Sequence, residues 1–135
     1  MDEPLTIAID AMGGDHAPDA VIGGVEHVLK ENSGVRFILF GPQDRLNPLV
    51  QTGSTTAPNI EIVHTEDFVA MDAKPTQALR KREKTSMWHA IKAVKDGSAD
   101  AIVSAGNTGA LMAMSYFCLG TADGISRPAI SALWP

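Results

Sequence analysis

Cysteine is nearly missing from this sequence, because Cys118 is the only one among 135 residues. A single thiol excludes an intrachain disulfide and gives no support to a cysteine metal cluster. The histidines show no metal-ligand spacing, so no metal site is predicted. Long apolar runs are also missing: the longest, 111–119, is about half of the roughly 20 residues that cross a bilayer. The first residues are acidic, unlike a secretory signal. These absences favour a cytoplasmic protein.

Positive charge is scarce overall but concentrated in one segment. The chain has 11 basic and 16 acidic residues, a net charge of −5. Residues 74–95 hold seven of the basic residues and one acid, which gives +6 and leaves −11 on the other 113 residues. A basic segment on an acidic chain indicates a local anionic partner more than affinity for nucleic acid. The alternative is a solvated helix face that binds nothing.

Short apolar, β-branched runs alternate with helical patterns along the chain. We expect strands at 6–9, 35–40, 60–63, 101–103 and 128–133. We expect the first helix to begin near Pro18 and to end by Gly34, and the second to lie around 46–50. The third follows Pro75, the fourth is capped by Ser86 and ends at Gly97, and the fifth runs from about 108 to 119. This alternation predicts an α/β fold with a mostly parallel sheet covered by helices on both faces. We expect residues 1–135 to belong to one domain that is cut short.

Two loops that contain glycine follow predicted strands, and either could bind an anion. The first glycine loop, residues 10–16, is DAMGGDH, and the second glycine loop, residues 104–109, is SAGNTG. In parallel sheets, ligands bind beyond the carboxyl ends of the strands, and helices that begin there offer free N–H groups to anions. We therefore expect both loops to meet at one edge of the sheet and to hold a small oxyanion. The alternative for each loop is a tight turn followed by a helix cap.

Nucleotide-binding motifs are absent from both loops. Neither G-x-x-x-x-G-K-[ST] nor a G-x-G-x-x-G after a strand occurs, which disfavours ATP, GTP and dinucleotide cofactors. Asp10 and Asp15 would repel a phosphate dianion, so at least one of them is expected to orient a loop, a base or a second substrate. His16 is interpreted as a structural histidine at the start of a helix.

The two loops carry a family resemblance. Residues 7–18 (IAIDAMGGDHAP) and 103–112 (VSAGNTGALM) resemble two signatures of the PlsX family of phosphate acyltransferases, and 124–129 (GISRPA) falls in the same order. The resemblance covers essentially the whole chain and implies the N-terminal part of a longer protein. It implies a fold like that of isocitrate and isopropylmalate dehydrogenases, related to phosphotransacetylases. It also implies a homodimer in the full-length form and a cytoplasmic enzyme that associates peripherally with an anionic membrane surface.

The activity implied is transfer of a fatty acyl group from acyl carrier protein to inorganic phosphate, which gives acyl phosphate for phospholipid synthesis without a cofactor. The residues expected to take part in catalysis are Asn107, Arg80 and Asp10. Those expected to bind phosphate or the acyl group are Gly13, Gly14, Ser104, Gly106, Thr108, Gly109 and Ser86. Those expected to dock acyl carrier protein are Lys81, Arg82 and Lys84.

Three other functions remain open from the sequence. A short-chain phosphotransacylase that uses acyl-CoA would share the fold and the chemistry. An NAD-dependent decarboxylating dehydrogenase would need an acidic metal cluster and a cofactor loop, and neither is visible in the sequence. A non-catalytic, truncated fragment that only binds phosphate is the third.

Overall fold

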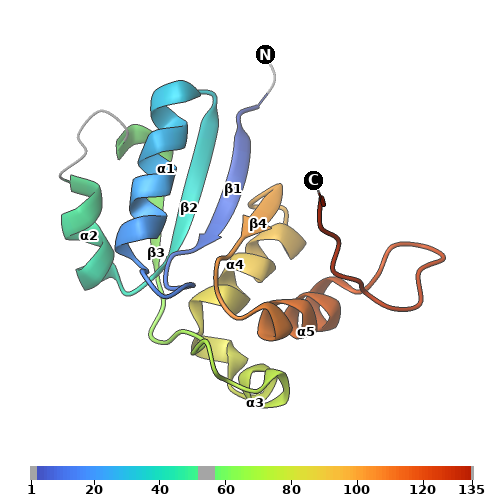
Figure 1. Cartoon of the computed structure of the whole chain (residues 1–135). Helices are drawn as coiled ribbons and strands as arrows, with labels where there is room; N and C mark the ends of the chain where they lie inside the picture. Colours follow the sequence, from blue (N-terminus) through green and yellow to red (C-terminus); the bar gives the residue numbers. More distant parts are fainter. Residues whose placement is uncertain (1–2, 52–56, 135) are drawn as a thin grey trace.

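A four-stranded parallel sheet forms the centre of the molecule (Figure 1). The computed structural model describes residues 3–51 and 57–134. The sheet contains β1 (Leu5–Asp10), β2 (Val35–Gly41), β3 (Ile60–His64) and β4 (Ala101–Val103), in the order β3-β2-β1-β4. The predicted α/β class, the parallel sheet and four of the five predicted strands are therefore confirmed.

Helices cover both faces of this sheet. They are α1 (Asp19–Glu31), α2 (Gln43–Gln51), α3 (Pro75–Arg80), α4 (Ser86–Lys95) and α5 (Thr108–Leu119), with 3₁₀ turns at Ala57–Asn59 and Arg82–Lys84. Side chains alternate across each strand, so Ile9 and Leu39 pack under α1 and α2 while Ala8 and Ile38 pack under α4. A further apolar cluster joins α3, α4 and α5, with Met87 and Met114 fully buried. α3 lies below the sheet in Figure 1, beyond the end at which β3 finishes.

The fifth predicted strand, 128–133, is wrong. Residues 120–134 have no helix or strand, and Ile130 is 68% exposed. Gly120 and Gly124 adopt positive φ angles of 75° and 80°, which turn the chain back after α5. The 128–130 segment consequently borders α5 beside Met112 instead of pairing with β4.

The start of one helix agrees with the prediction, and the cap of another differs from it. α1 begins at Asp19, with Pro18 at the N-cap, and it ends at Glu31, before Gly34. Thr85 rather than Ser86 caps α4, because the Thr85 hydroxyl accepts the N–H of Trp88 at 3.3 Å. Ser86 instead directs its hydroxyl away from the helix terminus to a carboxylate.

Candidate active site at the glycine loops

The two glycine loops touch each other. β1 and β4 are parallel neighbours, with Ile9 paired with Val103, so the chain leaves both strands at the same edge of the sheet. A Cβ atom on Gly13 would lie 2.9 Å from the Gly106 nitrogen, and one on Gly106 would lie 3.1 Å from the Gly13 Cα. The predicted convergence of the loops is confirmed, and their backbones approach too closely for any larger residue at position 13.

The buried Asp10 side chain forms hydrogen bonds to both glycine loops. Its side chain is almost completely buried, at 2% exposure. The Ser86 hydroxyl donates to Oδ1 at 2.6 Å, the Ser104 hydroxyl donates to Oδ2 at 2.8 Å, and the Met12 N–H donates to Oδ1 at 3.3 Å. One carboxylate therefore joins the first glycine loop, the start of α4 and the second glycine loop. Hydrogen bonds to a charged acceptor are the stronger kind, which makes this a firm connection.

The hydroxyls of the two serines are already used. Ser104 Oγ donates its proton to Asp10 and accepts the N–H of Gly106 at 3.1 Å. Ser86 is fully buried and donates to the same carboxylate. A serine hydroxyl has a single proton to give. In this arrangement both serines shape the loops, and neither has a proton left for a ligand.

Asn107 ties a third segment to the same place. Its side-chain oxygen accepts the Ala110 N–H at 3.0 Å and so caps α5. Its side-chain nitrogen lies 3.2, 3.0 and 2.8 Å from the carbonyl oxygens of Ala70, Met71 and Ala73. Only 8% of the residue is exposed. Asn107 thus fixes the 70–73 loop against the start of α5 and is fully engaged within the chain.

The groups that remain open at the junction belong mainly to the backbone. Among the described contacts, the N–H groups of Thr108 and Gly109 have no acceptor, as expected for the first turn of a helix. Thr108 is also exposed, so its hydroxyl adds a third donor. Gly14 borders this region with a φ of 109°, which only glycine adopts readily, and a Cβ there would lie 3.3 Å from the Ala105 carbonyl oxygen. Free N–H groups and the positive end of the helix dipole together suit an anion.

The four basic residues predicted to bind phosphate or acyl carrier protein differ in exposure and in their ion pairs. Arg80, at the end of α3, and Lys81 are exposed, and within the described chain neither forms an ion pair. Lys84 pairs with Glu66 at 2.5 Å. The hydrogen bond from Lys84 and its charge lower the pKa of Glu66, and Glu66 raises the pKa of Lys84 in the same way. No described contact connects Arg80 with the glycine loops.

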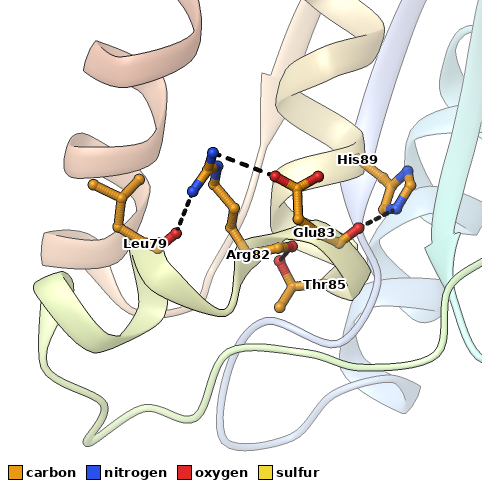
Figure 2. Close-up of polar contacts among 5 residues, drawn as sticks. All are labelled: Leu79, Arg82, Glu83, Thr85 and His89. Atoms are coloured by element: carbon orange, nitrogen blue, oxygen red, sulfur yellow. Dashed lines mark hydrogen bonds and ion pairs between the residues drawn. The ribbon is translucent and has the colours of Figure 1, made fainter.

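Arg82 turns inward. Figure 2 shows its guanidinium between the Leu79 carbonyl, 2.7 Å away, and the Glu83 carboxylate, 3.3 Å away. The same group lies 4.8 Å from the Trp88 ring centre and 4.5 Å from the Phe117 ring centre, within the range of cation–π attraction. Its side chain is 21% exposed. Arg82 therefore connects the Arg82–Lys84 turn to α4 and α5, a role that its position in a basic run did not suggest.

Sequence reasoning also missed Pro75 and the 70–73 loop. A Cβ on Gly109 would meet Pro75 Cγ at 2.8 Å, so α3 begins directly against the second glycine loop. Such a contact between residues far apart in the chain leaves no local pattern. Across 3–51 and 57–134 no cluster of histidine, cysteine or acidic side chains could hold a metal ion. No described helix is both long enough and apolar enough to span a bilayer.

The chain is similar in sequence to known proteins. The family described as "Fatty acid synthesis protein" matches residues 5–135. The phosphate acyltransferases of Azorhizobium caulinodans and Rhodospirillum rubrum are 52% and 50% identical to the chain over its whole length, and that of Chelativorans sp. is 51% identical over 97% of it. The chain spans 38–39% of the length of these relatives. Because the family match covers nearly every residue, this chain belongs to the fatty acid synthesis protein family, in agreement with its resemblance to phosphate acyltransferases.

Proposed function

We propose that the chain is part of a phosphate acyltransferase that moves a fatty acyl group from acyl carrier protein to inorganic phosphate. The observation that supports this most directly is the contact of the two glycine loops beside the free N–H groups of Thr108 and Gly109. The names of the relatives agree with an acyl transfer to phosphate. The product would be an acyl phosphate that enters phospholipid synthesis.

Phosphate would bind at the start of α5. The N–H groups of Thr108 and Gly109 and the Thr108 hydroxyl donate to its oxygens, and Gly14 forms the facing wall. A phosphate oxygen then attacks the thioester carbonyl carbon, a C–O bond forms, the C–S bond breaks, and the thiolate leaves with acyl carrier protein. Holding both reactants in this geometry contributes about 7–11 kcal/mol in favourable cases. Each donor directed at the oxyanion of the tetrahedral state adds about 2.7–4 kcal/mol.

Asp10 would act as a positioning residue in this reaction. Its two oxygens accept hydrogen bonds from Ser86, Ser104 and Met12 and hold the loops at their spacing. Asn107 would position the 70–73 loop around the same site. Arg80 is exposed at the end of α3, and we retain it as the residue that orients phosphate.

Acyl carrier protein would approach the exposed cations. Arg80 and Lys81 are exposed, and Lys81 lines a pocket with Ala70 and Ala73. Lys84 is also exposed but pairs with Glu66, whereas Arg82 is packed against aromatic rings. Attraction of this kind raises association rates and weakens with salt. We further propose a homodimer in the full-length form and peripheral contact with anionic lipid through the same basic surface.

The test is formation of acyl phosphate from palmitoyl-acyl carrier protein and phosphate, measured as the release of the acyl carrier protein thiol that depends on added phosphate. The phosphate acyltransferase of Azorhizobium caulinodans serves as the positive control. Thr108→Ala should lower the rate at least tenfold, which corresponds to about 1.4 kcal/mol. Thr121→Ala, an exposed threonine outside both loops, is the matched control and should leave the rate unchanged. Equal rates for Thr108→Ala and the unaltered chain would contradict the phosphate site proposed at the start of α5.

A second variant separates positioning from proton transfer at Asp10. Asp10→Asn preserves the side-chain volume. The new amide nitrogen can only donate, so it faces a serine hydroxyl that donated its proton to the carboxylate of Asp10. A positioning role predicts a lower rate with an unchanged shape of the pH–rate profile. Loss of one limb of that profile would instead identify Asp10 as a general base.

A further inference from the structure

An apolar groove runs beside the glycine loops on the opposite face from α4. It has a volume of about 380 Å³. Ile7 and Ile9 of β1 form its floor, and Val103 of β4 forms its far side. Val103 is 53% exposed although it is fully apolar. The volume lies within the range of small-molecule sites, which is about 300–1,000 Å³.

One face of α1 forms the near wall of the groove. Val21, Gly24, Val25 and Val28 all line it, and their spacing of three and four residues places them on one side of the helix. From Val21 to Val28 the helix advances about 10 Å, at 1.5 Å per residue. Val28 is 40% exposed, and a Cβ on Gly24 would meet no atom within 4 Å. The wall is therefore apolar and has open space in the middle.

The groove ends at the glycine loops. Asp10 and Ala105 close it, and the Ala105 carbonyl oxygen lies 3.3 Å from the Cβ position of Gly14. Asp10 is the only polar residue of the lining, and both of its side-chain oxygens accept hydrogen bonds from serines. A chain that lies in the groove would thus meet apolar surface along its length and would reach the loops at one end.

We propose that this groove binds the hydrocarbon chain of the acyl donor, with the thioester at the Asp10–Ala105 end. This inference rests on the proposed function, which places the thioester, the reacting end of the ligand, at the glycine loops. The groove provides the apolar surface for the rest of the ligand. The continuity between groove and loops favours this occupant, because the carbonyl carbon must lie beside the phosphate while the tail leaves the water. A bound chain would also cover the exposed surfaces of Val28 and Val103.

Two neighbouring glycines provide a matched test. A Cβ on Gly23 or on Gly24 meets nothing within 4 Å, and both lie inside α1, but only Gly24 lines the groove. The 135-residue chain and its Gly23→Leu and Gly24→Leu variants are titrated with cis-parinaric acid, a fatty acid whose fluorescence rises in apolar surroundings. Both substitutions raise helix propensity alike, so any shared change has that origin. We expect Gly24→Leu to raise the Kd at least tenfold and Gly23→Leu to leave it unchanged.

A second variant covers the case in which Gly24→Leu fails to fold. Val103→Glu places a charge at an exposed position on the far side of the groove and should also raise the Kd at least tenfold. Equal binding by all variants, or no binding by the unaltered chain, would overturn the proposal. Binding that weakens as the protein concentration rises would show that a second copy occupies the groove, which would overturn it as well.

Activity separates this inference from the proposed function. Rates of acyl phosphate formation are compared for butyryl and palmitoyl thioesters of acyl carrier protein. If Gly24→Leu loses at least tenfold only with the palmitoyl donor, both proposals are supported. Equal loss or no loss with the two donors would refute the groove while the transferase remains. Loss of parinaric acid binding in Gly24→Leu without any product from the unaltered chain would support the groove and give no support to the transferase.

Discussion

Replacing Gly13 with alanine tests the contact between the two glycine loops. The added Cβ would lie 2.7 Å from Asp10 Oδ2, 2.7 Å from Ser104 Oγ and 2.9 Å from the Gly106 nitrogen. The first two atoms share a hydrogen bond of 2.8 Å, so neither can retreat without weakening it. Overpacking costs about 1–3 kcal/mol, and a hydrogen bond to a charged group contributes about 1.5–3 kcal/mol. Since the two effects overlap, we expect the free energy of unfolding to fall by about 2–4 kcal/mol.

Urea denaturation followed by tryptophan fluorescence measures this change. Trp88 is 7% exposed and reports on the buried side of α4, whereas Trp134 is 94% exposed and contributes a nearly constant background. Gly23→Ala is the control, because its Cβ meets nothing within 4 Å. The control should raise the free energy of unfolding by about 0.5–1 kcal/mol, since alanine favours a helix over glycine. Equal stability of Gly13→Ala and the unaltered chain would refute the close approach of the loops.

Three further predictions concern residues around the site. Asn107→Asp keeps an oxygen for the α5 cap but places a carboxylate oxygen against the carbonyl oxygens of the 70–73 loop. The urea midpoint should therefore fall, and acyl phosphate formation should fall at least tenfold, about 1.4 kcal/mol. Glu66 should titrate below the ordinary pKa of glutamate in an NMR pH series, and Lys84→Ala should raise the pKa of Glu66. The pair contributes to stability at a pH above the ordinary pKa of glutamate, and this contribution is lost as the pH falls through the lowered pKa of Glu66. Lys81→Glu should raise the KM for acyl carrier protein and reduce its salt dependence, whereas Arg82→Ala should mainly lower the thermal midpoint, because Arg82 packs against two aromatic rings.

Much of the fold could be predicted because its cause is local. Strands 35–40 and 60–63 are short apolar runs with clear ends, and the structure extends each by a single residue. The 128–133 segment has the same β-branched and apolar character, yet it forms no strand. A strand requires a partner as well as a composition, and the glycine turns at 120 and 124 direct this segment to α5. Composition predicts which segments can become strands, and the chain path decides which of them do.

The candidate site could also be predicted only in part from the sequence. The place where the loops meet followed from strand–loop–helix order alone, since the ends of neighbouring parallel strands lie together. The roles of individual side chains did not follow. Ser104 and Asn107 are polar and adjacent to glycine, which fits a phosphate donor and a loop anchor equally well from the sequence. Only the distances to Asp10 and to the 70–73 carbonyls distinguish the two roles.

Asp10 explains how a carboxylate can lie beneath the proposed anion site. From the sequence its charge should repel phosphate, but in the structure two hydroxyls and one N–H surround it and it has almost no exposed surface. Donors oriented toward the carboxylate stabilise its charge locally. Those donors belong to the first glycine loop, to Ser86 of α4 and to Ser104 of the second loop, so the same bonds set the spacing of the two loops. The negative charge below the junction is therefore stabilised by the same bonds that hold the two loops together, and the second of these loops carries the N–H groups of Thr108 and Gly109 that have no acceptor among the described contacts.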